Sequence, residues 1–366
     1  MKSLKKVVVA MSGGVDSAVA AYLLVQAGYD VLGITMQIWQ SEDPDVVASQ
    51  GGCCGMTAAE DARFVCHQLG IPHYVLNFRD VFKRDVIDYF AQEYRAGKTP
   101  NPCIACNRYV KWQSLLERAM ELEADFIATG HYSQISRHEA TGRLTIQAAD
   151  NAKDQSYALY NLTQEQLART LFPIGTMPKD EVRRIAAQMI GLRVAHKPDS
   201  QEICFIPDDN HVRFLREYFG EELAAGDFVD EVGRVLGRHK GIGAYTIGQR
   251  KGLGMAFGRP MYVKEIDTAT GNVVLADDAA LFVRDMIVDD VNFMAISLGA
   301  QAGERSSPLR CFGKIRYSHK AAPCVIRYGD GIITCSFDEP QRAITPGQAA
   351  VFYDAAGRII CGGTIV

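Results

Sequence analysis

The chain has 366 residues, of which 48% are hydrophobic and 22% charged, and its formal net charge is −4. This length is too great for one hydrophobic core and predicts two or three domains, and the composition is that of an ordinary soluble globular protein. No apolar run approaches the roughly 20 residues that span a bilayer, so we expect no membrane association. The negative net charge argues against binding of nucleic acid over the whole surface.

The first predicted element is a buried strand over Val7–Met11, which leads through the sequence SGGVDS into a helix over Ala18–Gln26. A glycine-rich turn between a strand and a helix directs several backbone N–H groups at one spot, where the helix N-terminus adds partial positive charge. Ser12 and Ser17 can add hydroxyl donors. The turn therefore predicts a pyrophosphate site, although it lacks the Gly-Lys-Ser/Thr ending of a Walker loop.

Short apolar strands and longer helical patterns then alternate. Strands are predicted over Val31–Met36, His73–Asn77 and Phe126–Thr129, and helices over Ala58–Leu69, Lys111–Leu122 and Lys179–Met189. This alternation predicts a parallel sheet that binds ligands at the carboxyl ends of its strands. His131 follows one such end and could meet a phosphate or be structural; for His196 we expect a structural role.

After about Phe205 the pattern changes to a helix over His211–Tyr218 and a stretch, Gly233–Gly258, that is too glycine-rich for a packed helix. Short runs of β type follow, with a turn predicted at Asp338-Glu339-Pro340. Such spacing is typical of a small barrel or sandwich. The predicted strands are Met286–Val291, Lys314–Tyr317, Cys324–Tyr328, Ile332–Phe337, Ala349–Tyr353 and Ile359–Ile365.

Basic residues form two blocks in this C-terminal half. No Asp or Glu lies between Glu231 and Glu265 or between Glu304 and Asp330. One-sign blocks suit a phosphate backbone, and the alternative is a solvated surface. The cations are Arg234, Arg238, Lys240, Arg250, Lys251, Arg259 and Lys264 in the first block, and Arg305, Arg310, Lys314, Arg316, Lys320 and Arg327 in the second.

The basic N-terminus runs into an apolar stretch too short for a signal peptide, so we expect a cytoplasmic location, where cysteines rarely form structural disulfides. A thiolate beside a pyrophosphate site can attack an electrophile that ATP has activated. Cys106 and Cys204 supply such a pair if the fold brings them together. Three further thiols are of interest, Cys53, Cys54 and Cys103; we expect Cys66, Cys311, Cys324, Cys335 and Cys361 to be buried as small hydrophobic groups.

The sequence SGGVDS resembles the PP-loop of ATP pyrophosphatases. The chain as a whole resembles the bacterial-type tRNA-specific 2-thiouridylases, which thiolate position 2 of the wobble uridine in tRNA. The resemblance covers nearly the full length and is carried by the stretches VVVAMSGGVDSAVAAYLL, RAGKTPNPCIACNRYVKW, ADFIATGHY, NAKDQSYALY, SQEICFIP, YTIGQRKGLG and FDEPQRAITPGQAAVFYD. It implies an α/β fold: a PP-loop (HUP-like) domain over 1–206, a small central tRNA-contacting domain over 207–283 and a C-terminal β-barrel over 284–366.

The resemblance also implies roles for single residues. Cys106 corresponds to the catalytic nucleophile, Cys204 to the cysteine that carries a persulfide, and Asp16 is placed to hold Mg²⁺ or to order the pyrophosphate. ATP would be held by Ala10, Met11, Ser12, Gly13, Gly14, Val15, Asp16, Ser17, Met36 and Gly130. Asn101, Pro102 and Cys103 would face the target base, and Lys153, Asp154, Gln155, Arg316 and Tyr317 would contact tRNA. The sulfur would come from a cysteine desulfurase, directly or through relay proteins.

Two questions stay open at this point. Many members of the family have Asp where this chain has Cys103, so Cys103, Cys106 and Cys204 could together ligate an iron–sulfur cluster or zinc with one open position. We favour a persulfide and disulfide cycle of Cys106 and Cys204. The rival functions are a PP-loop ligase or amidotransferase, and a non-catalytic tRNA-binding or sulfur-carrier protein; the CxxC motif with Cys204 speaks against the former, and the intact loop against the latter.

Overall fold

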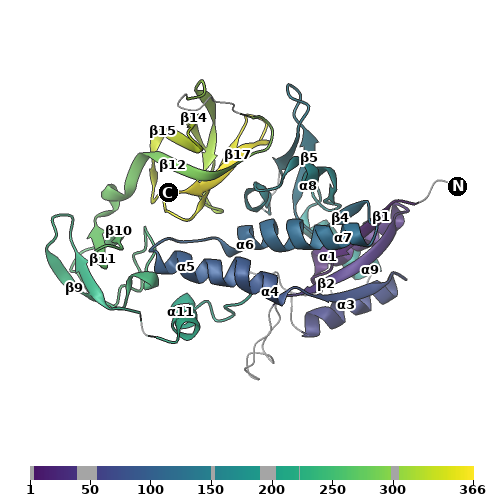
Figure 1. The fold of residues 1–366 in the computed structure, drawn as a ribbon, viewed down its shortest axis with the longest axis horizontal. Coiled ribbons are helices and arrows are strands. Elements are labelled where there is room, and N and C mark those ends of the chain that lie inside the picture. Colours follow the sequence, from purple (N-terminus) through teal and green to yellow (C-terminus); the bar gives the residue numbers. More distant parts are fainter. Residues whose placement is uncertain (1–3, 39–55, 150–152, 190–202, 222, 298–304) are drawn as a thin grey trace. The chain divides into compact units, whose positions relative to one another are not determined.

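The computed structural model describes residues 4–38, 56–149, 153–189, 203–221, 223–297 and 305–366 (Figure 1). The chain divides into two compact units. The first consists of Met1–Ile87, Cys103–Asp209 and Gly357–Ile359, and the second of Asp88–Pro102, Asn210–Ala356 and Ile360–Val366. Each unit thus takes segments from distant parts of the sequence.

The first unit is built on a parallel sheet of order β3-β2-β1-β4-β7. The predicted parallel sheet is therefore confirmed. Its strands are β1 (Lys6–Ala10), β2 (Asp30–Gln37), β3 (His73–Asn77), β4 (Phe126–Ala128) and β7 (Thr170–Leu171). A separate antiparallel pair is formed by β5 (Ser133–Arg137) and β6 (Leu144–Ala148).

Three helices of this unit, α1 (Val15–Gln26), α3 (Met56–Gln68) and α9 (Lys179–Met189), share one hydrophobic core with β1. Val7 and Val9 of β1 are fully buried there, as the alternation of side chains along a strand requires. Figure 1 shows α1 and α9 next to each other beside β1. This packing fixes the start of α1, and with it the turn after β1.

The remaining helical elements in the described residues up to 209 are shorter, and several of them follow one another directly. They are α4 (Arg79–Phe82), η1 (Lys83–Asp88), α5 (Tyr89–Arg95), α6 (Pro102–Ala105), η2 (Cys106–Leu115), α7 (Leu116–Glu121), η3 (Ser156–Leu159) and α8 (Gln164–Ala168). The predicted helix over Lys111–Leu122 thus begins earlier, because helical structure runs without a break from Pro102 through α6, η2 and α7 to Glu121. Cys106 therefore lies about one turn inside a continuous helical segment that begins at Pro102.

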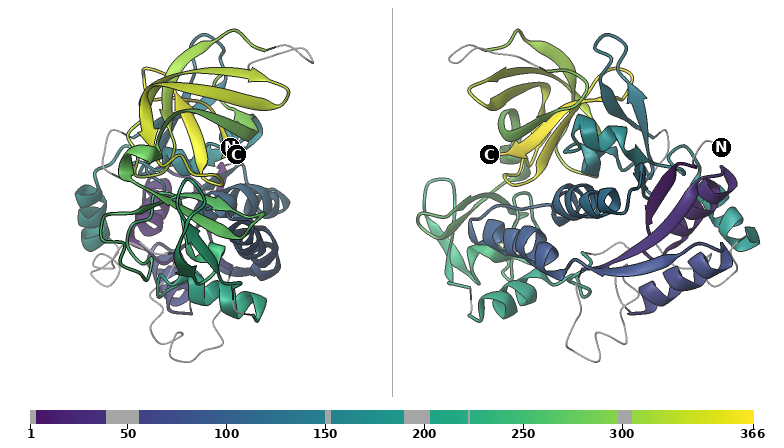
Figure 2. Two further views of the ribbon diagram at one scale, coloured as in Figure 1. Left: turned by 90° about the vertical axis from the view of Figure 1, so that its left-hand side faces the viewer. Right: turned by 45° about the vertical axis from the view of Figure 1, so that its right-hand side comes forward.

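The second unit contains a sheet of order β10-β11-β8-β9 and a closed barrel of order β12-β15-β14-β13-β16-β17. The sheet is formed by β8 (Gly226–Val229), β9 (Val235–His239), β10 (Tyr262–Asp267) and β11 (Asn272–Ala276), with helices α11 (His211–Phe219), η4 (Ile242–Ala244) and η5 (Asp278–Leu281) beside them in the sequence. The barrel strands are β12 (Phe282–Phe293), β13 (Leu309–Lys314), β14 (Ala322–Gly329), β15 (Ile332–Arg342), β16 (Ala349–Tyr353) and β17 (Ile359–Ile365). Figure 2 shows this barrel from two further sides, and the predicted C-terminal barrel is confirmed.

One predicted strand and one predicted turn of the barrel are wrong. The strand expected over Lys314–Tyr317 is β13, which ends at Lys314, where its pairing with β16 stops. The buried side chain of Ile315 imitates a strand pattern there. The turn expected at Asp338-Glu339-Pro340 lies inside β15, because Asp285 pairs with Ser336 and Val283 with Gln341, so residues 337–340 form a bulge opposite β12 while Phe337 still pairs with Cys324 of β14. A bulge accommodates Pro340, which has no N–H to donate.

The cysteines predicted to be buried are buried. Cys66 lies in the core of the first unit, where burial raises the pKa of its thiol to about 12. Cys311, Cys324, Cys335 and Cys361 lie in the core of the barrel, and the sulfur atoms of Cys311 and Cys324 are 3.6 Å apart. These thiols therefore serve as small core groups.

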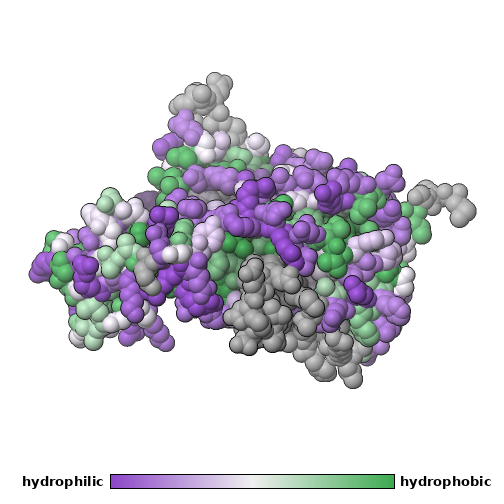
Figure 3. Space-filling view, turned by 60° about the horizontal axis from the view of Figure 1, so that its bottom comes forward, coloured by the Kyte–Doolittle hydropathy of each residue, from purple (hydrophilic) through white to green (hydrophobic). Residues whose placement is uncertain are grey.

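The surface drawn in Figure 3 mixes hydrophilic and apolar side chains, with hydrophilic ones prevailing. Within the part of the chain that the structure describes, none of the helices has the length and apolar character needed to cross a membrane.

Candidate active site

The turn between β1 and α1 requires glycine at Gly13. Its φ of +68° is a left-handed conformation, and a Cβ atom there would lie 2.3 Å from the carbonyl oxygen of Ala58. Gly14 caps α1 with extended backbone, φ −97° and ψ 169°. The first N–H groups of α1 have no acceptor within the helix, so they point out of its N-terminus toward the loop. The turn thus has the backbone geometry of an anion site.

The two serines of the loop brace it internally. The hydroxyl of Ser17 donates to the carbonyl oxygen of Gly14 at 3.1 Å and accepts from the backbone N–H of Ser12 at 3.2 Å. The hydroxyl oxygens of Ser12 and Ser17 are 3.2 Å apart. Since Ser17 is 3% exposed, its hydroxyl holds the loop in shape, whereas Ser12 is only partly buried.

Asp16 lies in the first turn of α1 and is held by two residues that the sequence analysis did not single out. Both oxygens of its carboxylate accept hydrogen bonds of 2.8 Å from Nζ of Lys179, and Oδ1 also accepts from the hydroxyl of Tyr132 at 2.7 Å. The side chain of Lys179 is 13% exposed and that of Asp16 32%. Nζ of Lys179 also lies 5.7 Å from the ring centre of Tyr132. A lysine from α9 thus stands at the loop, which has none of its own.

Gly130 connects the carboxyl end of β4 to the same place. A Cβ atom on Gly130 would lie 2.7–2.8 Å from atoms of Asp16 and Ser17, so only glycine allows this close approach. Met36, near the carboxyl end of β2, is half-buried and pairs with Leu76 of β3. The predicted nucleotide residues in β1, α1, β2 and β4 therefore all lie at the carboxyl ends of the sheet or directly after them.

His131 has a structural environment. Its ring lies 5.5 Å from that of Trp112 and 6.0 Å from that of Phe172, and its Nδ1 is 2.7 Å from the hydroxyl of Thr129. Burial and the charge of Lys111 hold the pKa of His131 well below its ordinary value, so the ring is neutral. A neutral ring packed between aromatic side chains is a poor phosphate ligand. Of the two roles considered for His131, phosphate binding and a structural role, this environment favours the structural one. His196 lies outside the described residues.

The two thiols with predicted catalytic roles, Cys106 and Cys204, are accessible, and each is followed in the sequence by a buried residue. Cys106 is half-buried, and the neighbouring Asn107 donates to the carbonyl oxygen of Ala158 at 2.8 Å. Cys204 is exposed, while the next residue, Phe205, is buried against Phe82 at 5.8 Å between ring centres. The buried neighbours fix the backbone at each thiol.

Cys103 is exposed and belongs to the short helix α6. Among the described residues, no three His, Cys, Asp or Glu side chains are placed to hold a metal ion together. Cys103, Cys106 and Cys204 are all described, and they do not form such a group in this structure. Cys53 and Cys54 lie outside the described residues.

Comparison with known proteins agrees with this architecture. Residues 5–208 match the family model of the tRNA methyl transferase HUP domain, 212–277 that of the tRNA methyl transferase PRC-barrel domain, and 283–366 that of the aminomethyltransferase beta-barrel domain. The tRNA-specific 2-thiouridylase MnmA of Lachnoclostridium phytofermentans is 54% identical over 99% of this chain and 100% of its own length. The protein of that name from Clostridioides difficile is 52% identical over 99% of this chain and 98% of its own.

The chain belongs to the tRNA-specific 2-thiouridylase family. The resemblance seen in the sequence is therefore confirmed, and so is the predicted order of a HUP domain, a small central domain and a β-barrel. Among solved structures, a predicted subunit of tRNA methyltransferase from Methanocaldococcus jannaschii is 20% identical with a TM-score of 0.32, covering 50% of this chain and 77% of that one. A likeness of this extent adds nothing to the assignment.

In this thiouridylase-family chain, two of the residues expected to contact tRNA are engaged inside the first unit. The carboxylate of Asp154 accepts from the backbone N–H groups of Ala149 and Ser156 at 3.0 and 3.1 Å. Gln155 is bonded to Tyr132 twice: its Oε1 accepts from the Tyr132 N–H at 3.0 Å, and its own N–H donates to the Tyr132 carbonyl oxygen at 3.0 Å. Gln155 thus positions Tyr132, which in turn holds Asp16, while Lys153 is exposed.

Arg316 and Tyr317 line a cavity of about 520 Å³ in the second unit. Nη1 of Arg316 donates to the carbonyl oxygen of Arg342 at 3.1 Å, and Tyr317 is 47% exposed, with Nζ of Lys314 5.6 Å from its ring centre. The remaining lining residues are Thr99, Thr246, Ile247, Gly248, Ser318, Arg342, Ala343, Thr345 and Gln348. An exposed aromatic ring beside two cations is a surface on which a nucleobase and its phosphate can be bound.

Several cations of the two basic blocks are neutralised in the folded structure by carboxylates from outside the blocks. In the first block, four cations form ion pairs with carboxylates that lie outside it: Arg234 with Asp230, Arg238 with Asp227, Arg259 with Asp277 and Lys264 with Glu231, at 2.7–3.1 Å. Within the described ranges, Lys240, Arg250 and Lys251 have no such partner. In the second block, Arg310 pairs with Asp338 at 2.5 Å. The positive charge that remains for a phosphate backbone is therefore confined to a few positions.

Proposed function

We propose that this chain catalyses the ATP-dependent 2-thiolation of the wobble uridine of tRNA. Proteins named tRNA-specific 2-thiouridylase are more than 50% identical to it over almost its whole length. The observation that carries the proposal in the structure is the turn after β1, where Gly13 has a conformation and a close approach that only glycine permits. Such a turn is built for the pyrophosphate of a nucleotide.

ATP would be bound by residues 10–17, Met36 and Gly130, with its phosphates at the N-terminus of α1. Lys179 would take the part of the missing Walker lysine and bring a positive charge to the phosphates. Mg²⁺ usually binds one or two carboxylates together with substrate phosphates. Both carboxylate oxygens of Asp16 are bonded to Lys179, so a Mg²⁺ ion held by Asp16 would share these oxygens with the ammonium group or displace it. We propose that Mg²⁺ enters with ATP as part of the substrate.

The chemistry would begin with attack of the uridine C2 oxygen on the α-phosphate of ATP, which releases pyrophosphate and leaves C2 bearing an adenylate. The terminal sulfur of a persulfide on Cys204 would then attack C2, and AMP would leave with the oxygen. The thiolate of Cys106 would attack the sulfur of Cys204, releasing the 2-thiouridine and forming a Cys106–Cys204 disulfide. A thiol reductant would restore the two thiols, and a cysteine desulfurase or sulfur-relay protein would reload Cys204.

The roles of the remaining predicted residues stand as proposals. Asn101, Pro102 and Cys103 would face the target base, and Lys153, Arg316 and Tyr317 would contact tRNA. For Asp154 and Gln155 the contacts described above support an indirect part, through the backbone before η3 and through Tyr132. We retain the division into domains over 1–206, 207–283 and 284–366, and a cytoplasmic location.

The proposal is tested by incubating the protein with tRNA, ATP and a persulfide donor and analysing the nucleosides of the tRNA by mass spectrometry. We expect 2-thiouridine derivatives together with AMP and pyrophosphate, and no thiolation with Cys106→Ser or Cys204→Ser. Release of ADP and phosphate would overturn adenylation. AMP formation without sulfur incorporation would favour a ligase or amidotransferase, and binding of tRNA without nucleotide turnover would favour a non-catalytic protein.

A further inference from the structure

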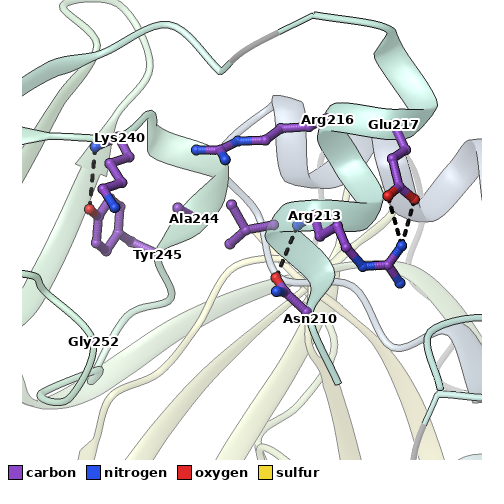
Figure 4. A pocket seen from close by; sticks show the side chains of 9 residues that line it. Asn210, Arg213, Arg216, Glu217, Lys240, Ala244, Tyr245 and Gly252 are labelled. Atoms are coloured by element: carbon purple, nitrogen blue, oxygen red, sulfur yellow. Dashed lines mark hydrogen bonds and ion pairs between the residues drawn. The ribbon is translucent and has the colours of Figure 1, made fainter. Parts of the chain in front are cut away.

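A second cavity of the second unit, about 560 Å³ in volume, lies between α11 and the segment that runs from Lys240 to Tyr245. Figure 4 shows Arg216 extending from α11 toward the wall that carries Lys240 and Tyr245. Arg213 projects from the same helix, and Asn210 lies at its start, where the side-chain oxygen accepts from the N–H of Arg213 at 3.0 Å. Two faces with cations thus enclose one space.

Both walls are held firmly. On α11, Leu215 is 1% exposed, and the ring of Phe214 lies 5.9 Å from that of Phe90. On the other wall, the buried ring of His239 links two backbone groups: its Nε2 is 3.0 Å from the carbonyl oxygen of Gly271, and its Nδ1 accepts from the N–H of Gly241 at 3.0 Å. An accepting Nδ1 requires a neutral ring, in agreement with the pKa of His239, which burial lowers. The turn that carries Lys240 is therefore fixed.

The charges along the lining do not cancel. The lining residues include three cations, Arg213, Arg216 and Lys240, and one carboxylate, Glu217, so their formal charges sum to about +2. Both oxygens of Glu217 lie 2.7 Å from Nη1 of Arg213, which neutralises that pair. Lys240 has no ion-pair partner among the described residues. A surplus of positive charge along one cavity favours an anionic ligand.

The surplus continues beyond the cavity. Gly252, which lines it, directly follows Arg250 and Lys251, and these two cations also have no carboxylate partner in the part of the chain that the structure describes. Several cations in succession match the repeated phosphates of an RNA strand better than a single small anion. An acidic protein partner would need apolar anchor sites as well, whereas this lining is mainly polar and charged.

We propose that this cavity, with Lys240 as its principal cation and Arg216 on the facing wall, binds backbone phosphates of the tRNA. The inference rests on the proposed function, since it takes tRNA as the substrate, and it adds a contact to the RNA backbone. Because phosphates carry no sequence information, the site would contribute affinity and orientation rather than selection of particular tRNAs.

The test compares Lys240→Ala with Lys264→Ala, a matched control. Both variants remove one lysine from the same sheet region, but Lys264 is already paired with Glu231 at 2.7 Å. The dissociation constant for full-length tRNA is measured at several salt concentrations between 50 and 200 mM. We expect Lys240→Ala to reduce the log–log salt slope by about 0.7–0.9, so that its disadvantage against the wild type changes about threefold over this range. Lys264→Ala should retain the wild-type slope.

A second measurement locates the phosphates directly. Ethylation of single tRNA phosphates should weaken binding to the wild type at a few positions, and Lys240→Ala should become insensitive at one or more of them. Arg216→Gln should give the same pattern, and it should leave the packing of Leu215 and Phe214 unchanged. Equal slopes and equal interference patterns for Lys240→Ala, Arg216→Gln and the wild type would overturn the site. Failure of the wild type to thiolate bound tRNA would count against the proposed function instead, since the binding measurements need no chemistry.

Discussion

Replacement of Lys179 by methionine removes the ammonium group that meets Asp16 while keeping most of the side-chain volume. The structure predicts two separable effects. One is on stability, because the carboxylate of Asp16 loses two hydrogen bonds of 2.8 Å. The other is on catalysis, if the same ammonium group binds phosphate during the reaction.

The loss of stability should be small. Hydrogen bonds to charged groups are worth about 1.5–3 kcal/mol when well desolvated, but Asp16 is 32% exposed and retains its bond from Tyr132. We therefore expect a loss of about 1–2 kcal/mol, which lowers the melting temperature of a unit of this size by roughly 2–8 °C. A native protein with a stability of about 5–15 kcal/mol stays almost wholly folded after such a loss.

The loss of catalysis should be much larger. Removal of one preorganised group that stabilises developing charge costs about 10²–10³ in rate. We expect Lys179→Met to slow tRNA-dependent release of AMP and pyrophosphate by about this factor, measured with saturating tRNA at a temperature well below melting. The stability effect cannot account for a loss of this size.

A double variant separates direct action of Lys179 from mere neutralisation of Asp16. If Lys179 acts only by cancelling the charge of Asp16, Lys179→Met/Asp16→Asn will be as active as Asp16→Asn alone. If Lys179 binds phosphate, the double variant will be about 100-fold slower than Asp16→Asn. Equal rates for these two variants would refute the reasoning and leave Lys179 with a structural part only.

Three further outcomes are expected. Arg250→Ala/Lys251→Ala and Arg316→Ala should each weaken tRNA binding without altering ATP binding. The log–log salt slope of tRNA binding should fall by about one per charge removed. Unchanged slopes would show that these residues are solvated surface groups that do not contact phosphate. Cys103→Ser should keep substantial thiolation activity in air with a persulfide donor. This prediction would be contradicted if the anaerobic wild-type protein were brown and absorbed near 400 nm, and if Cys103→Ser lost that colour. The pKa of His131 is lower in the folded state than in the unfolded state, so protonation favours unfolding. The free energy of unfolding should therefore fall as the pH drops below about 6.5, and His131→Phe should reduce this dependence. An equal pH dependence in both proteins would speak against a buried neutral ring.

Sequence alone was sufficient where a local pattern carries the whole signal. The turn from Ser12 to Ser17 is recognisable because its glycines, strand and helix are contiguous, and strands such as His73–Asn77 and Ile359–Ile365 match their predicted bounds. Burial of Cys66 was also predicted, because a lone cysteine is commonly buried as a small hydrophobic group. In these cases the period of the apolar residues and the conformational limits of glycine act within a few residues of one another.

The barrel shows where local patterns mislead. Asp338-Glu339-Pro340 has the composition of a turn, yet it continues β15 as a bulge because β12 pairs on both sides of it. The residue types of these three positions do not show with which strand they pair. The prediction failed because the pairing of distant strands, not the preference of the segment, determined its conformation.

The contacts of the site were decided only by tertiary structure. Lys179 meets Asp16 across 163 positions of sequence, and Tyr132 meets it across 116. Likewise, Lys264 lies in a block without acids, but the fold brings Glu231 to 2.7 Å from it, while Lys240 keeps its charge unpaired among the described residues. Charge along a chain is fixed by the residue types, whereas the field at a site depends on which of those charges the packing of helices and strands brings within a few ångströms of each other.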